Sequence, residues 1–257
     1  MPNAVDLVFA IIVFVAGALL DYFVLWPHLL RNVSRGDAGA RTRVYSITMA
    51  WEWLAAIFVA ERWWVLARPW TALWLLPPRG WRLLAGALAV LAGAALWRSQ
   101  ARALARLSAE KRAALRRRSG HLLALAPRTA AEYRRFVCLS VTAGICEELL
   151  YRGFLVWALQ YWIGLGWAAA VSVILFGAAH AYQGKDVVRP TVAGVVLQGI
   201  ALLTQSILPG MLVHAMLDVM SGASGHTLLR ESGPAAQAAP SSELSAARMV
   251  IPRDTAT

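Results

Sequence analysis

Long apolar runs recur along the chain and limit what it can fold into. They cover residues 5–26, 44–60, 81–97, 136–163, 167–180, 191–203 and 211–220. A stretch of about 17–25 mostly apolar residues can cross the hydrocarbon core of a bilayer. Because 59% of the residues are hydrophobic and only 15% are charged, a soluble domain would lack the polar surface to cover itself. The sequence therefore predicts an all-α, polytopic transmembrane bundle of about seven spans.

The basic residues predict the orientation of this bundle. The net charge is +11, and most arginines lie after the first run or between the third and fourth runs. If the N-terminus lies outside, these loops fall in the cytoplasm, and so do Lys185 and Arg189. Only Arg68, Arg79 and Arg82 then fall in an outer loop, which satisfies the positive-inside rule. We expect a multi-pass protein of the bacterial inner membrane with cytoplasmic basic loops, whose partner is anionic lipid and not nucleic acid.

The chain divides into four parts. Residues 1–97 hold three spans, 98–135 a basic connector, 136–230 a polar-containing helical bundle, and 231–257 a tail rich in Ala, Ser and Pro that we expect to be disordered. The connector places four apolar residues at mixed three- and four-residue steps among arginines, which predicts an amphipathic helix on the inner membrane surface. These residues are Leu104, Leu107, Ala114 and Leu115.

Two acidic residues interrupt the otherwise apolar first two spans. Asp21 and Glu52 are the carboxylates in question. Each can either pair with an arginine at a neighbouring helix end or belong to a polar pathway through the membrane. Pairing with arginine is the favoured interpretation, since the same spans carry few other polar groups.

The segment ICEELLYRGFL, residues 145–155, puts three charges in an apolar helical run. Glu148 and Arg152 are four residues apart, so on an α-helix they face each other and can pair. Glu147 points about 100° away from Glu148 and has no cation three or four residues along. An unpaired buried carboxylate has the properties of a general base. The alternative is an ionic contact between helices that uses all three side chains.

Two further polar sites lie on later spans. His180 ends the fifth span, and His214 and Asp218 share one face of the seventh because they are four residues apart. The His214–Asp218 pair can be an imidazole oriented by its carboxylate, two ligands of one metal, or a packing hydrogen bond. Since isolated polar groups are costly in hydrocarbon, we expect these groups and Glu147 to share one pocket containing a water.

Three motifs together resemble those of the CPBP (CAAX protease / Abi) family of intramembrane endopeptidases. EELLYRGF at 147–154 is similar to the family's EExxxR motif, FGAAH at 176–180 to FxxxH, and HAMLD at 214–218 to HxxxN/D. Order and spacing agree over roughly residues 130–225. The resemblance implies hydrolysis of peptide bonds within the membrane, and CAAX members of the family act after a lipidated cysteine.

The same resemblance implies roles for individual residues. Glu147 and His180 would activate the water, while His214 and Asp218 would hold the oxyanion or orient the site. Glu148 and Arg152 would support them.

One position departs from the prenyl-protease pattern, which commonly has asparagine where this chain has Asp218. An ionised aspartate cannot donate a hydrogen bond to an oxyanion, so Asp218 would act protonated or would favour a bound cation. Glu147, His180, His214 and Asp218 are candidate zinc ligands, whereas a glutamate-type mechanism requires no cofactor. The sequence leaves both schemes open.

We therefore expect an intramembrane endopeptidase that cleaves a membrane-associated protein or peptide, with water activated by Glu147 and His180. Two alternative functions would explain the same polar residues. A non-enzymatic scaffold of the same fold would keep the polar residues for stability. A proton-coupled carrier would use them as a relay, although the chain shows no inverted repeat.

Overall fold

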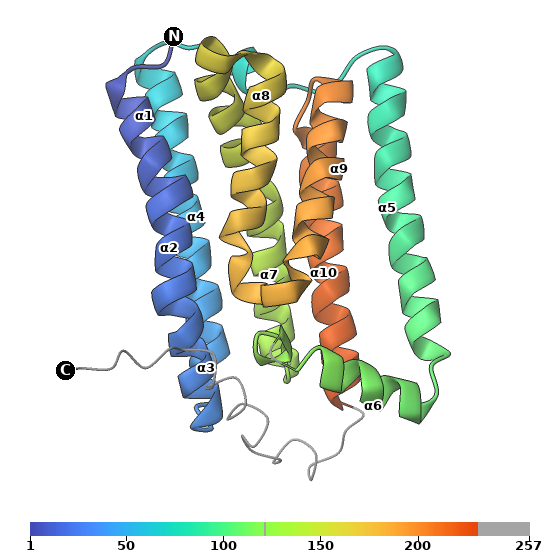
Figure 1. The fold of residues 1–257 in the computed structure, drawn as a ribbon. Coiled ribbons are helices and arrows are strands. Elements are labelled where there is room, and N and C mark those ends of the chain that lie inside the picture. Colours follow the sequence, from blue (N-terminus) through green and yellow to red (C-terminus); the bar gives the residue numbers. More distant parts are fainter. Residues whose placement is uncertain (121, 231–257) are drawn as a thin grey trace, which may run out of the picture.

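The computed structural model describes residues 1–120 and 122–230. All regular structure in these ranges is helical, and the long helices run side by side as a bundle (Figure 1). The predicted all-α bundle is therefore confirmed. The expected disorder of residues 231–257 falls outside the described ranges.

The first half of the chain contributes three long helical segments. Their elements are α1 (Ala4–Ile11), η1 (Ile12–Ala16), α2 (Gly17–Leu20), η2 (Asp21–Leu25), α3 (Trp26–Ser34), α4 (Ala40–Val65), η3 (Trp70–Leu73) and α5 (Trp81–Ala105). The elements from α1 to α3 form one continuous helix in which two π-helical turns, η1 and η2, interrupt the α-helical winding.

A buried ion pair fixes the start of this first helix. Asn3 caps α1, and its side chain accepts from the backbone N–H of Asp6 at 3.2 Å. The Asp6 carboxylate is fully buried and accepts two hydrogen bonds from Arg68, at 2.6 and 3.1 Å. Because Arg68 follows α4 in the chain, this contact holds the first helix against the end of α4.

The basic connector differs from the predicted single amphipathic helix. Leu104 lies in the last turn of α5, and Leu107 lies in the break that follows. Only Ala114 and Leu115 fall in the short helix α6 (Ala109–Arg118). No residue of α6 is buried, and α6 crosses the lower end of the bundle in Figure 1. The four apolar residues therefore do not lie on one continuous helix, and the position of the connector on the membrane surface stays a prediction.

The second half holds the predicted polar segments. Its elements are η4 (Leu122–Ala124), α7 (Ala130–Glu147), η5 (Glu148–Leu155), α8 (Val156–Ala179), η6 (Ala181–Val187), α9 (Val188–Thr204) and α10 (Leu208–Arg230). Within α8 the chain reverses at Gly164, whose φ of 75° lies in a region that glycine adopts without strain. The reversal separates the runs predicted at 136–163 and 167–180.

The turn between α8 and α9 lies about halfway along the bundle (Figure 1). It contains η6, which follows His180 directly. Lys185 and Arg189 were expected in an inner loop with the other basic residues. They instead lie on this turn and at the start of α9, away from the end of the bundle that α6 crosses.

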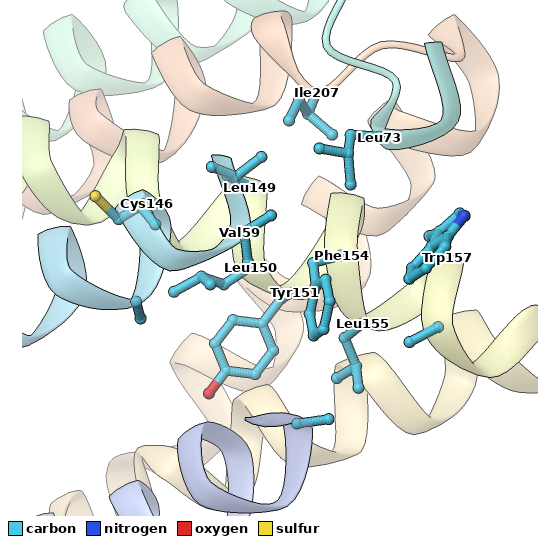
Figure 2. Packing of buried hydrophobic residues seen from close by; sticks show 14 of the residues in the cluster. Val59, Leu73, Cys146, Leu149, Leu150, Tyr151, Phe154, Leu155, Trp157 and Ile207 are labelled. Carbon is cyan, nitrogen blue, oxygen red and sulfur yellow. The ribbon is translucent and has the colours of Figure 1, made fainter. Parts of the chain in front are cut away.

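The core of the bundle surrounds η5. Figure 2 shows Leu150, Phe154 and Trp157 projecting from η5 and the start of α8, with Val59 of α4 and Leu73 of η3 nearby. Trp63 of α4 completes this packing, with its ring centroid 4.6 Å from that of Trp157. This buried aromatic packing supports the polar segment that begins at Glu148.

A close helix crossing brings α10 against α7. A Cβ added at Gly144 would lie 2.7 Å from the backbone oxygen of Met211, closer than such atoms approach. Only glycine permits this crossing, which is typical of small residues between packed membrane helices. It places His214 beside the end of α7, where Glu147 and Glu148 lie.

Four helical segments of the described chain are long and apolar enough to cross a membrane. They are Ala4–Ser34, Trp81–Ala105, Ala130–Ala179 and Ala181–Thr204. The predicted spans in α4 and α10 do not meet the same criterion; α4 carries Glu52, Glu61 and Arg62. The number of crossings, about seven, stays a prediction.

Candidate active site

The polar segment of the first motif is wound differently from the expected α-helix. Residues Glu148–Leu155 form a π-helical stretch continuous with α7, and all eight of them are buried. Such stretches occur often at functional sites because the wider turn re-aims the side chains. Here the change of winding begins directly after Glu147, between the two glutamates whose roles were expected to differ.

Glu148 and Arg152 form the predicted ion pair. Glu148 Oε1 lies 3.1 Å from Arg152 Nη1, and neither side chain is exposed. Arg152 Nη2 also donates to the backbone oxygen of Gly194 at 3.3 Å, and its guanidinium lies 4.2 Å from the ring centroid of Phe176. The guanidinium therefore joins η5, α8 and α9, and its charge is neutralised within the bundle.

His214 is held by Glu148 and not by Asp218. Its Nδ1 donates to Glu148 Oε1 at 2.9 Å, whereas Asp218 Oδ2 lies 3.8 Å from Nε2, beyond hydrogen-bonding distance. Glu147 Oε2 lies 3.7 Å from the same Nε2. One interpretation of the sequence has Asp218 orient the His214 ring. In the structure Glu148 of η5 lies closer to that ring and orients it instead.

His180 lies at the C-terminal end of α8. Its Nδ1 is 2.8 Å from the backbone oxygen of Phe176. A carbonyl oxygen can only accept, so Nδ1 donates this hydrogen bond. The end of α8 thus holds the His180 ring at the wall of the cavity.

A cavity of about 370 Å³ joins these elements. Glu147, His180 and Asp218 all line it. His214, Glu148 and Arg152 do not line the cavity themselves. His214 lies directly behind the lining residues, since its Nε2 is within 4 Å of both Glu147 and Asp218. The structure thus brings the three predicted polar segments together around one space of a size that can admit part of a peptide.

The first half of the chain contributes two acidic residues to the same cavity. Asp21 of η2 and Glu52 of α4 both line it, and Glu52 lies beside Glu147. No ion pair joins either carboxylate to a basic residue within residues 1–120 and 122–230. The expected pairing with arginines was therefore wrong, and the alternative of a polar pathway describes their position better.

Zinc ligation by Glu147, His180, His214 and Asp218 stays a prediction. In the described part of the chain, no three His, Cys, Asp or Glu side chains are grouped so that they could hold a metal ion. Nδ1 of His180 and Nδ1 of His214 each hydrogen-bond to an oxygen atom, which leaves Nε2 as the only ring nitrogen of either histidine that could bind a metal.

Comparison with known proteins agrees with the three motifs. Residues 130–220 match the family model described as type II CAAX prenyl endopeptidase Rce1-like, which confirms the resemblance over that region. No curated protein and no solved structure matches the chain significantly. Four helical segments are long and apolar enough to cross a bilayer, and together with the match they point to an integral membrane protein whose residues 130–220 are similar to a peptidase family.

Proposed function

We propose, from the match of residues 130–220 to type II CAAX prenyl endopeptidases, that this protein is an intramembrane endopeptidase. Its substrate would be a membrane-anchored protein or peptide that is cut near its membrane attachment. The observation that carries this proposal is the shared cavity: the candidate base Glu147 and the imidazole of His180 line one space of about 370 Å³ inside the bundle.

In the proposed reaction, a water in this cavity attacks the carbonyl carbon of the substrate. Glu147, assisted by Nε2 of His180, takes the proton of the water as the new C–O bond forms. The same proton is then delivered to the amide nitrogen as the C–N bond breaks. The products are a new carboxyl terminus and a free amine, with no net change in the enzyme.

His214 and Asp218 would stabilise the tetrahedral intermediate. A protonated His214 would donate from Nε2 to the oxyanion while Nδ1–H remains bonded to Glu148, which lies 2.9 Å away. The buried Glu148–Arg152 pair would hold this imidazole in place. Asp218, as a protonated acid, would serve as a second donor.

The Glu147→Gln variant tests the proposal. Glutamine keeps the size of the side chain but cannot accept the proton, so we expect cleavage to fall by about 100-fold or more. The measurement is mass spectrometry of the C-termini of membrane proteins from cells that express either form. New C-termini should appear with the native protein and disappear with Glu147→Gln.

Glu61→Gln is the matched control, because Glu61 is an exposed carboxylate on α4 away from the cavity. It should cleave like the native protein. If Glu147→Gln inserts normally and produces the same C-termini at the native rate, Glu147 is not the base. If Glu147→Gln instead loses its fold in detergent, the non-enzymatic scaffold becomes the better explanation.

The arginines of α6 are the proposed contact with anionic lipid. Arg116, Arg117 and Arg118 end this helix, and each basic residue near an anionic surface contributes about 1 kcal/mol of attraction. We expect purified protein to retain phosphatidylglycerol in preference to phosphatidylcholine. Native mass spectrometry of the Arg117→Gln/Arg118→Gln variant should show this preference reduced, and an unchanged preference would contradict the assignment.

A further inference from the structure

We propose that the cavity receives a basic side chain of the substrate, lysine or arginine, with Glu52 and Asp21 as its anionic partners. The proposal rests on the proposed function, because the basic group would belong to the peptide being cut. It adds a substrate class that residues 130–220 do not themselves encode, since both partners lie in the first half of the chain.

The charges around the cavity are strongly one-sided. Four carboxyl groups line it, from Asp21, Glu52, Glu147 and Asp218, and no lysine or arginine does. Glu52 is 7% exposed and its Oε2 atom has no hydrogen-bond partner. Neighbouring carboxyl groups such as Glu52 and Glu147 are costly to ionise together in a low-dielectric setting, so the cavity is complementary to an incoming cation.

The protein's own nearby cations are already engaged. Arg152 binds Glu148 and the backbone oxygen of Gly194. Arg41 donates to the backbone oxygen of Ala124 and lies 3.9 Å from Glu132. Neither arginine lines the cavity, so neither neutralises Glu52 directly.

The walls of the cavity suit a lysine or arginine stem. Most of the lining is apolar, and Trp26 and Trp51 contribute aromatic surface. Such walls cover the aliphatic part of a basic side chain while its charged end reaches the carboxylates, and aromatic faces attract cations. Since Glu52 lies beside Glu147, a basic group bound there would bring the adjoining peptide bond close to the proposed base.

Cysteine-labelling rates measure the charge of this cavity without any cleavage. Thr48 lines the cavity one turn before Glu52 on α4. The experiment uses full-length Thr48→Cys protein in a non-ionic detergent, with Cys138→Ser to remove the exposed thiol and with the buried Cys146 kept. The probes are trimethylammonium-ethyl methanethiosulfonate, a cation, and sulfonato-ethyl methanethiosulfonate, an anion. Cys138→Ser protein without Thr48→Cys gives the background rate.

We expect the ratio of cation to anion labelling rates to fall by about tenfold when Asp21→Asn and Glu52→Gln are added. Adding Glu61→Gln instead should leave the ratio unchanged, because that carboxylate does not line the cavity. A ratio that is insensitive to Asp21→Asn and Glu52→Gln would overturn the proposal and would show that the carboxyl groups neutralise one another by sharing protons. Failure of both probes to react would also overturn it, since no side chain could then enter.

These outcomes are separable from those of the proposed function. Loss of the labelling effect would leave cleavage and its dependence on Glu147 intact, and a protein without protease activity could still show the charge preference. Cleavage sites found by C-terminal mass spectrometry provide a second check: if they lack a nearby lysine or arginine, the substrate assignment is wrong.

Discussion

Replacing His180 with alanine should reduce peptide-bond cleavage by about 100- to 10,000-fold, the contribution typical of a positioned acid or base. The ring lines the cavity together with Glu147. Its Nδ1 is bound to the backbone oxygen of Phe176 at 2.8 Å, which leaves Nε2 to exchange protons with the water. The rate is measured as the appearance of the new C-terminus, normalised to the amount of inserted protein. His28→Ala, at an exposed position of α3, is the matched control and should retain the native rate.

A second substitution at the same position separates catalysis from support of the helix end. His180→Asn retains an N–H that can donate to Phe176, but it has no basic nitrogen to accept a proton. If His180 acts in catalysis, both His180→Ala and His180→Asn should be inactive. Native activity in the asparagine variant would show that His180 only terminates α8.

Replacing Arg152 with methionine should lower the free energy of unfolding by about 3–5 kcal/mol, the cost of breaking a buried ion pair from one side. The substitution removes the partner of Glu148, 3.1 Å away, and leaves that carboxylate with His214 alone in a site without solvent exposure. It also removes the link to the backbone of Gly194 on α9. The measurement is reversible unfolding in mixed detergent micelles.

Arg189→Met is the control for this experiment. Arg189 lies 3.9 Å from Asp186, but its side chain is 65% exposed, and exposed pairs contribute between about 0 and 1 kcal/mol. Adding Glu148→Gln to Arg152→Met should restore part of the lost stability, since it removes a buried carboxylate that has lost its arginine and keeps only His214 as a partner. If the double variant is no more stable than Arg152→Met, lost packing and not an unpaired carboxylate explains the effect.

The sequence predicts well those features that depend on local periodicity. Apolar runs place the long helices, and the reversal at Gly164 falls between two predicted runs. The i,i+4 spacing of Glu148 and Arg152 correctly predicts their ion pair. Each of these features is determined by residues that are close in the chain.

Contacts between segments that are distant in the chain could not be predicted from local periodicity. Spacing favours Asp218 as the partner of His214, but packing of α10 against α7 brings Glu148 closer. Asp21 and Glu52 were visible as carboxylates in apolar runs, yet spacing alone does not show that they face Glu147.

The turn between α8 and α9, halfway along the bundle, has a consequence for the surrounding lipid. Residues 165–179, between the reversal at Gly164 and His180, are about 22 Å long at 1.5 Å per residue, against a hydrocarbon thickness of about 30 Å. Acyl chains beside this pair of helices therefore meet a shortened apolar wall, and the bilayer must thin there or let water reach the turn. A locally thinned membrane would shorten the route from the leaflet to the interior of the protein.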